Sequence, residues 1–253
     1  MNETIRKIIE EYVAGYPEGA GTVTRWQPPL VAFAAADDPL FPEVHNQVSP
    51  THALPADLLV DARTVIVYFI PFHEDVVTSN IAGVPCSREW AVAYIETNRL
   101  IADLNQHLAG WLAGRGYSGV ATPATHNFDP QKLISDWSHR HIAYIAGLGS
   151  FGLNNMLITA KGCCGRLGSL VTNLIIEPTP RTGVETCLYK QRGLCRKCVG
   201  RCFNAALTEE GFDRHRCYAM CLVNADRYSE LGLTDVCGKC LVNVPCSRLS
   251  PGG

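Results

Sequence analysis

Residues 185–207 read ETCLYKQRGLCRKCVGRCFNAAL, and two more cysteine-bearing stretches follow, HRCYAMC at 215–221 and DVCGKCLVNVPC at 235–246. Nine of the chain's 12 cysteines lie in these stretches: Cys187, Cys195, Cys198, Cys202, Cys217, Cys221, Cys237, Cys240 and Cys246. The spacing C-x2-C-x3-C joins Cys195, Cys198 and Cys202, and Cys237 and Cys240 form a second C-x2-C pair. Buried thiols are common singly, so this density indicates a chemical role for the tail.

The C-x2-C-x3-C spacing is typical of a bacterial ferredoxin run. In such a run the early cysteines bind one [4Fe–4S] cluster and the last cysteine crosses to the second cluster. The net charge of the tail agrees with the binding of two such clusters. Residues 179–253 contain 11 Lys and Arg against seven Asp and Glu, and two oxidised clusters with their eight thiolates carry roughly −4.

Two other uses of these cysteines stay open until the metal is measured. A secreted disulfide framework is disfavoured because the sequence shows no signal peptide and disulfides are rare in the cytosol. Structural zinc also uses C-x2-C pairs, but its sites close with two such pairs or with histidines. Here a third cysteine follows the first pair at ferredoxin spacing.

The whole chain has 253 residues, 47% of them hydrophobic, and a formal net charge of −2. This length allows one sizeable core and a smaller second unit. The balanced charge argues against nucleic acid as a partner. No apolar run reaches the roughly 18 residues of a membrane span, and the charged start MNETIRKIIEEYV lacks the apolar core of a signal peptide. We therefore expect a cytoplasmic protein without a membrane partner.

The composition changes at Glu177-Pro178-Thr179-Pro180, which we interpret as a hinge between two domains, 1–178 and 179–253. The first domain holds only three cysteines, Cys86, Cys163 and Cys164, and it carries 11 Lys and Arg against 17 Asp and Glu. Apolar runs predict strands at 29–36, 64–70, 156–159 and 167–176. A helix is predicted at 87–113, with one apolar stripe made of Trp90, Tyr94, Ile101, Leu104, Leu108 and Trp111. Another helix is predicted from an Asp129-Pro130 cap onward. Interleaved strands and helices indicate an α/β or α+β layered domain.

A glycine-rich segment, AGLGSFGLNNMLIT at 146–159, contains G-x-G-x-x-G. A dinucleotide-binding site requires a strand before this loop and a helix after it, and the predicted order here is the reverse. A helix C-cap explains Gly147. Three glycines together indicate a backbone that lies close to something flat or bulky.

Four segments of the sequence together resemble a known superfamily of enzymes. RHIAYIAGLGSFGLNNMLIT (140–159), GRLGSLVTN (165–173), TVIVYFIPF (64–72) and the cysteine tail resemble the superfamily of epoxyqueuosine reductases and corrinoid reductive dehalogenases. The resemblance spans residues 25–250. It implies an α+β fold, with a nitroreductase-like α/β layered domain over 1–178 that binds a corrinoid. A ferredoxin-like domain with two [4Fe–4S] clusters would follow over 179–253.

The function implied is that of an oxidoreductase supplied by a low-potential electron donor. The clusters would reduce cobalamin, or flavin as the second choice, held beside the cofactor-binding residues Gly147, Gly149, Ser150, Phe151 and Gly152. The substrate would be a small molecule. The alternative is a ferredoxin-like carrier that reduces a partner corrinoid protein and has no substrate of its own. No counterpart of the repeat domain of tRNA-acting members follows, so a tRNA substrate is not expected.

The resemblance also implies metal ligands, with two departures. The family run is C-x2-C-x2-C-x3-C, and Arg192 stands where its first cysteine is expected, so Cys187 is the replacement. Cys246 follows Pro245 and lies off the usual spacing of the second half. By position, one cluster takes Cys187, Cys195, Cys198 and Cys246, and the other takes Cys202, Cys217, Cys237 and Cys240. Cys221 is left over.

The catalytic acid of the family is an aspartate ahead of the glycine loop, which implies Asp129 here, with Asp136 as the alternative. Tyr144 would donate a proton, as tyrosines do in dehalogenases. Ordinary roles compete with each assignment: a helix cap for Asp129, a surface charge for Asp136 and packing for Tyr144.

Overall fold

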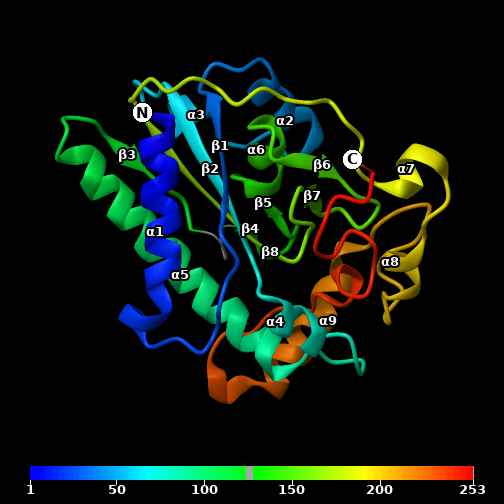
Figure 1. Cartoon of the computed structure of the whole chain (residues 1–253). Helices are drawn as coiled ribbons and strands as arrows, with labels where there is room; N and C mark the ends of the chain where they lie inside the picture. The colour runs from blue at the N-terminus through cyan, green and yellow to red at the C-terminus, as the bar shows by residue number, and fades with distance from the viewer. Residues whose placement is uncertain (124–127, 253) are drawn as a thin grey trace.

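The computed structural model describes residues 1–123 and 128–252, and a four-stranded antiparallel sheet lies at its centre (Figure 1). The strand order is β1 (Leu30–Ala35), β2 (Thr64–Pro71), β8 (Gly165–Thr172) and β3 (Gly119–Val120). The predicted strands at 29–36 and 64–70 are confirmed. The strand predicted at 167–176 ends earlier, at Thr172, whose hydroxyl accepts a hydrogen bond from the Leu174 backbone N–H and so begins a turn.

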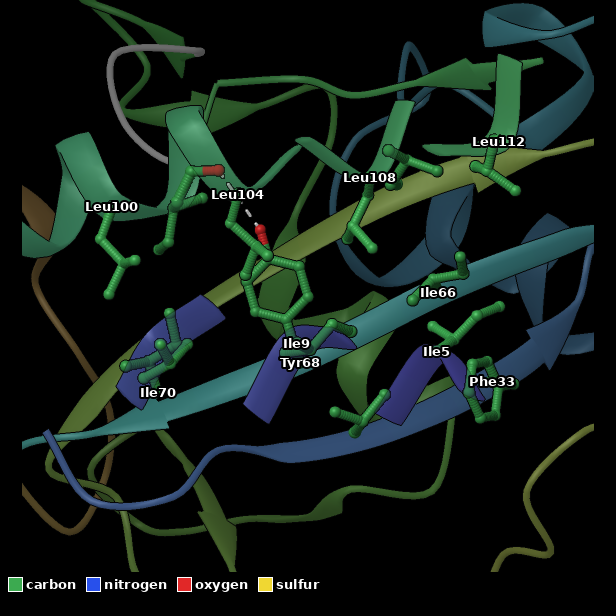
Figure 2. Close-up of a cluster of buried hydrophobic side chains, with 14 of the residues drawn as sticks. Ile5, Ile9, Phe33, Ile66, Tyr68, Ile70, Leu100, Leu104, Leu108 and Leu112 are labelled. Carbon is green, nitrogen blue, oxygen red and sulfur yellow. Dashed lines mark hydrogen bonds between the residues drawn. The ribbon is translucent and has the colours of Figure 1, made fainter. Parts of the chain in front are cut away.

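Strand β2 explains the layering, because all eight of its residues are buried. Side chains alternate between the faces of a strand, so an unbroken apolar run needs cover on both faces. Ile66, Tyr68 and Ile70 pack against α1 (Asn2–Ala20) and α5 (Arg88–Ala113), as Figure 2 shows. Their neighbours Val65 and Val67 face the opposite layer, which contains α2 (Leu40–Gln47) and α6 (His139–Ile145).

Helix α5 forms as predicted. The Ser87 hydroxyl accepts a hydrogen bond from the Trp90 N–H at the helix start, and Gly114 follows its last residue. Its buried leucines contact β2, and the Tyr68 hydroxyl donates to Asn105 Oδ1 at 2.8 Å, so this polar group is satisfied inside the core. The predicted apolar stripe is wrong at one position. Trp111 is only partly buried, under the Arg115 guanidinium, and Leu112 takes the buried place.

The helix predicted to begin at Asp129-Pro130 is wrong. Asp129 lies in β4 (Phe128–Asp129), which pairs with β5 (Ile134–Ser135), and helix α6 begins only at His139. The Asp129 side chain accepts hydrogen bonds from the backbone N–H groups of Gln131 and Lys132, both at 2.8 Å. An aspartate side chain caps a turn as readily as a helix. Leu133 then adopts a φ of 53°, which a right-handed helix cannot contain.

The tail contains short elements. These are α7 (Leu188–Arg192), α8 (Lys197–Gly200), α9 (Arg214–Arg227) and the 3₁₀ turns η1 (Ser229–Leu231) and η2 (Lys239–Leu241). The remaining elements are α3 (Pro55–Leu58), α4 (Glu74–Ser79), β6 (Gly149–Phe151) and β7 (Leu157–Thr159). Within the ranges that the structure describes, no helix combines the length and apolar composition needed to cross a bilayer.

The tail packs into the layered part of the chain. The Tyr94 hydroxyl donates to Asp235 Oδ1 at 2.7 Å, and Lys239 Nζ donates to the Asn80 carbonyl at 2.9 Å. Trp90 of α5 shares one buried cluster with Leu241 and Val242 of the tail. The tail and the first part of the chain therefore share buried apolar residues. The domain boundary at residue 178 stays a prediction.

Histidines on the α6 side of the sheet make stability depend on pH. His139 is buried between the Ser169 hydroxyl and the Pro123 carbonyl, and burial lowers its pKa to about 4. Burial and the neighbouring Arg140 likewise lower the pKa of His141 to about 4. An unfolded histidine titrates near 6.5. Between about pH 6.5 and pH 4 the unfolded chain therefore binds protons that these histidines do not bind in the folded protein. The free energy of unfolding decreases as the pH is lowered through this range.

We expect the thermal unfolding midpoint to be lower at pH 5 than at pH 7. His139→Gln should reduce this difference, because it removes one of the groups that titrate only in the unfolded chain. His107 is exposed, so His107→Gln should leave the difference unchanged. Equal pH dependence in wild type and His139→Gln would contradict the assignment.

Candidate functional site

Four of the predicted ligands surround one small cavity, and we call them group 1: Cys187, Cys195, Cys198 and Cys246. Cys187 precedes α7, Cys195 lies two residues before α8, Cys198 lies within α8, and Cys246 is near the end of the chain. Together with Pro245 and Pro251 they line a cavity of about 20 Å³. Burial raises the pKa of the Cys198 thiol to about 11, and the neighbouring Cys246, Cys187 and Cys195 thiols add to the shift.

The other four predicted ligands, group 2, are Cys202, Cys217, Cys237 and Cys240. They lie along a larger cavity of about 390 Å³, which we call cavity A. Burial raises the pKa of Cys240 well above its usual range, and the thiols of Cys217, Cys237 and Cys202 raise it further. The Cys198 thiol of group 1 also acts on Cys240. The two groups are therefore adjacent.

The eight thiols thus line two cavities, and they come from segments up to 59 residues apart in the chain. Among the described residues, no three His, Cys, Asp or Glu side chains are placed so as to hold a metal ion. The ligand roles therefore stay predictions. The donor set suits an iron–sulfur cluster, since such clusters are held by four cysteine thiolates each.

The leftover Cys221 lies one helical turn after Cys217 on α9 and also lines cavity A. Its thiol donates a hydrogen bond to Cys217. That bond, and next the Arg140 guanidinium, lower the pKa of Cys217. Both thiols therefore lie beside the other group 2 cysteines, and the choice of Cys217 as the ligand stays a prediction.

Gly238 sets the second C-x2-C turn. Its φ is 70°, and it lies inside the Cys237–Cys240 turn. A Cβ added there would fall 2.2 Å from Cζ2 of Trp90, so the turn backbone rests directly on the indole ring. The sequence placed Trp90 on the buried side of its helix but gave no sign of this contact.

Three cysteines outside the tail adjoin the two groups. Cys246 donates to the Cys163 thiol, Cys163 donates to Cys164, and the Cys164 thiol donates to the Leu241 carbonyl at 3.2 Å. Cys86 is buried next to Cys237. The pair Cys163-Cys164 therefore lies behind Cys246 of group 1, a position that only the folded chain reveals.

Two arginines that sequence reasoning missed also line cavity A. Arg140 of α6 donates to the Asn155 carbonyl at 2.6 Å, and Arg166 of β8 lies over the Tyr94 ring at 4.5 Å. Burial lowers the pKa of both guanidinium groups, and the Cys217 thiol acts on Arg140. Both arginines lie in the segments RHIAYI and GRLGS that carry the resemblance, and this was the available signal.

The glycine segment 147–152 does not line cavity A. A Cβ at Gly149 would fall 2.1 Å from the Ile158 carbonyl oxygen, and one at Gly152 would fall 2.6 Å from Asn154 Oδ1. Gly147 has a φ of 82° and lies against Pro180. The three glycines thus lie close to other parts of the same chain, namely the β6–β7 hairpin and residues 180–181. The Ser150 hydroxyl is paired with Thr186, and Phe151 packs on His141.

The predicted acids lie outside the thiol groups. Asp129 is on an exposed turn whose neighbours Phe128 and Leu133 line cavity A. Hydrogen bonds from the backbone of Lys132 and Gln131 lower its pKa, which favours the carboxylate over the proton donor. Asp136 accepts from the Thr51 hydroxyl at 2.7 Å. Tyr144 is 42% exposed and does not line cavity A. These catalytic roles stay predictions.

The sheet domain with a cysteine-rich tail folded against it defines a mixed α/β protein with two gathered thiol groups. Neither a family model nor a curated protein matches the chain. Solved structures do. Epoxyqueuosine reductase from Bacillus subtilis, described with its catalytic loop swung out of the active site, superposes with a TM-score of 0.58 at 17% identity over 96% of this chain. The enzyme from Streptococcus thermophilus gives 0.54 at 16% over 94%.

A catabolic reductive dehalogenase in complex with 3-bromo-4-hydroxybenzoic acid superposes with a TM-score of 0.58 at 16% identity over 87% of this chain. The chain spans 66% of the length of each of the two reductases above and 30% of the dehalogenase. At these identities the comparison shows the fold. It confirms at that level the resemblance identified from the motifs.

Proposed function

We propose that this protein is an iron–sulfur oxidoreductase that holds one [4Fe–4S] cluster in group 1 and one in group 2. It would deliver electrons to an acceptor in cavity A. The observation that carries the proposal is that the eight predicted ligand thiols line two adjacent cavities, four in each, with Cys221 as a fifth thiol in cavity A. When bound, each cluster supplies one-electron transfer. The fold of known reductases supports the same conclusion.

The positions of the two thiol groups suggest a direction for electron transfer through the protein. Group 1 lies behind the exposed α7–α8 segment, and group 2 faces cavity A. The Cys198 and Cys240 thiols are the point where the groups approach. Electrons would therefore enter at group 1 and leave from group 2.

The corrinoid implied by the resemblance does not fit inside cavity A. A volume of about 390 Å³ is near the lower end of the range for drug-sized ligands. A corrinoid is far larger, and a group 2 cluster would occupy part of the same space. The glycines predicted to admit it are closed by the chain's own backbone. We therefore derive no step through a corrinoid or a flavin and propose a small-molecule acceptor.

The second candidate function is an electron carrier for a partner redox protein. Cavity A is lined in part by Phe203 and Phe212, whose side chains are 48% and 39% exposed, so a partner can reach it. Turnover of a small molecule by the isolated protein supports the oxidoreductase. Electron delivery only to an added corrinoid protein supports the carrier.

The primary test is metal analysis after anaerobic purification. We expect about eight iron and eight sulfide per chain, the content of two [4Fe–4S] clusters. Stoichiometric zinc without sulfide would overturn the proposal. Cobalamin and flavin mononucleotide are then titrated into the protein. Tight binding of either would reinstate that group as the acceptor.

The Arg140 side chain should tune the group 2 cluster. A half-buried cation beside Cys217 stabilises the more negative, reduced cluster, so Arg140→Gln should lower the reduction potential of one cluster and leave the other unchanged. Redox titration followed by electron paramagnetic resonance measures both potentials. The exposed Arg63 provides the control Arg63→Gln. Equal shifts of both clusters, or no shift, would contradict this role.

A further inference from the structure

The segment over group 1 has an unusual charge. Residues 188–200, LYKQRGLCRKCVG, contain four Lys and Arg and no Asp or Glu, although the whole chain has a net charge of −2. We call this segment, which forms α7, α8 and the loop between them, the entry face. In Figure 1 it lies at the edge of the molecule, on the side opposite α1 and the far end of α5.

Three cations of the entry face are free to meet a partner. Lys190, Arg192 and Lys197 are exposed, and among the described residues none has a carboxylate within ion-pair distance. The fourth cation, Arg196, already pairs with Glu209 at 2.9 Å. The entry face therefore presents uncompensated positive charge to solvent.

An apolar side chain stands among these cations. Leu194 is 79% exposed, on the loop that Gly193 starts with a φ of 69°. Nothing in the described chain covers it. An exposed leucine with cations on both sides in the sequence has the composition of a small interface, with an apolar centre and a charged rim.

The entry face is also the outer wall of group 1. Cys187 immediately precedes it, and Cys195 and Cys198 lie within it. The rate of electron tunnelling falls steeply with distance. A donor seated on Leu194 would therefore reach group 1 by a short path, whereas a donor elsewhere would have to cross the sheet domain or cavity A.

We propose that the entry face is the docking surface for an acidic one-electron carrier protein, a low-potential ferredoxin. This inference rests on the proposed function. Each encounter oxidises the carrier's reduced cluster by one electron and reduces the group 1 cluster by one electron, with no proton or group transferred. Redox encounters of this kind use small interfaces, and opposite charges set their rate.

The test is the rate of cluster reduction in a stopped-flow experiment at low ionic strength. The donor is a reduced, acidic bacterial ferredoxin. The charge-reversed variant K190E/R192E/K197E should react at least about 10-fold more slowly than wild type, since steering contributes about 10- to 10³-fold to such rates. The wild-type rate should fall as salt is added, and the variant should lose this dependence. The neutral variant K190Q/R192Q/K197Q should lie between the two.

Two controls locate the effect. The variant K7E/R63E/R99E carries the same charge change on exposed positions of the layered domain and should keep more of the wild-type rate than the entry-face variant. The methyl viologen radical cation needs no docking site and should reduce the entry-face variant no more slowly than wild type. Leu194→Ala should slow the ferredoxin reaction even at high salt, where the charges are screened.

Iron and sulfide analysis of every variant separates the two proposals. Chains without clusters in the wild type would refute the proposed function. Intact clusters with equal ferredoxin rates in wild type and both entry-face variants would refute the docking surface alone. A wild type that ferredoxin does not reduce, while methyl viologen does, would refute it too.

Discussion

Cys217→Ala should lose one cluster, about four of eight iron atoms, whereas Cys221→Ala should keep both. The two residues form a matched pair, because they lie one turn apart on α9 and line the same cavity. They differ in their thiols. Cys217 accepts the hydrogen bond from Cys221 and lies near Arg140, so its pKa is lowered, while that hydrogen bond raises the pKa of Cys221. The thiolate is the ligand.

The measurement is iron and sulfide content with the electron paramagnetic resonance spectrum of the reduced protein. The variant Cys187→Ala applies the same measurement to group 1. Cys187 lies off the usual spacing and is predicted to take the place of the first cysteine of the family run. It should lose the other cluster and leave the group 2 signal intact. Iron loss in Cys221→Ala together with full iron in Cys217→Ala would show that the assignment within α9 is reversed.

Gly238→Ala should combine a large loss of stability with loss of the group 2 cluster. Its Cβ would meet Trp90 atoms at 2.2–2.6 Å, and the backbone has a φ of 70° that disfavours any side chain. Overpacking and the left-handed backbone together should cost roughly 2–5 kcal/mol. The turn would have to lift from the indole, and this would displace Cys237 and Cys240.

Gly183→Ala is the control that separates the two causes. Gly183 has a similar φ of 65°, but an added Cβ there would meet nothing within 4 Å. It should cost only the backbone part, about 1–2 kcal/mol, and retain both clusters. Trp90→Leu in the Gly238→Ala background should recover part of the stability and of the iron. Equal losses in the two glycine variants would show that the Trp90 contact is unimportant.

Local patterns in the sequence predicted much of the architecture. An unbroken apolar run predicted β2, and Ser87 with the following stripe predicted α5, because a strand or helix is specified by its own period and caps. The spacing of cysteines, read with the resemblance, predicted two sets of four metal-binding thiols. These thiols line two adjacent cavities, and their ligand roles stay predictions. The same local reading failed at Asp129, because one side-chain cap serves a turn and a helix equally well.

Contacts between distant segments decided the rest. The glycine segment predicted a bulky neighbour, and the tertiary structure supplied one from the chain itself at Ile158 and Pro180. The placement of Cys163 and Cys164 behind group 1 depends on contact with Cys246, more than 80 residues away. The positions of Arg140 and Arg166 beside cavity A depend on how α6 and β8 pack against the tail. Spacing along the chain determines which residues share a turn or a face. Only packing of the layers determines which faces meet, because that depends on burying apolar area from every segment at once.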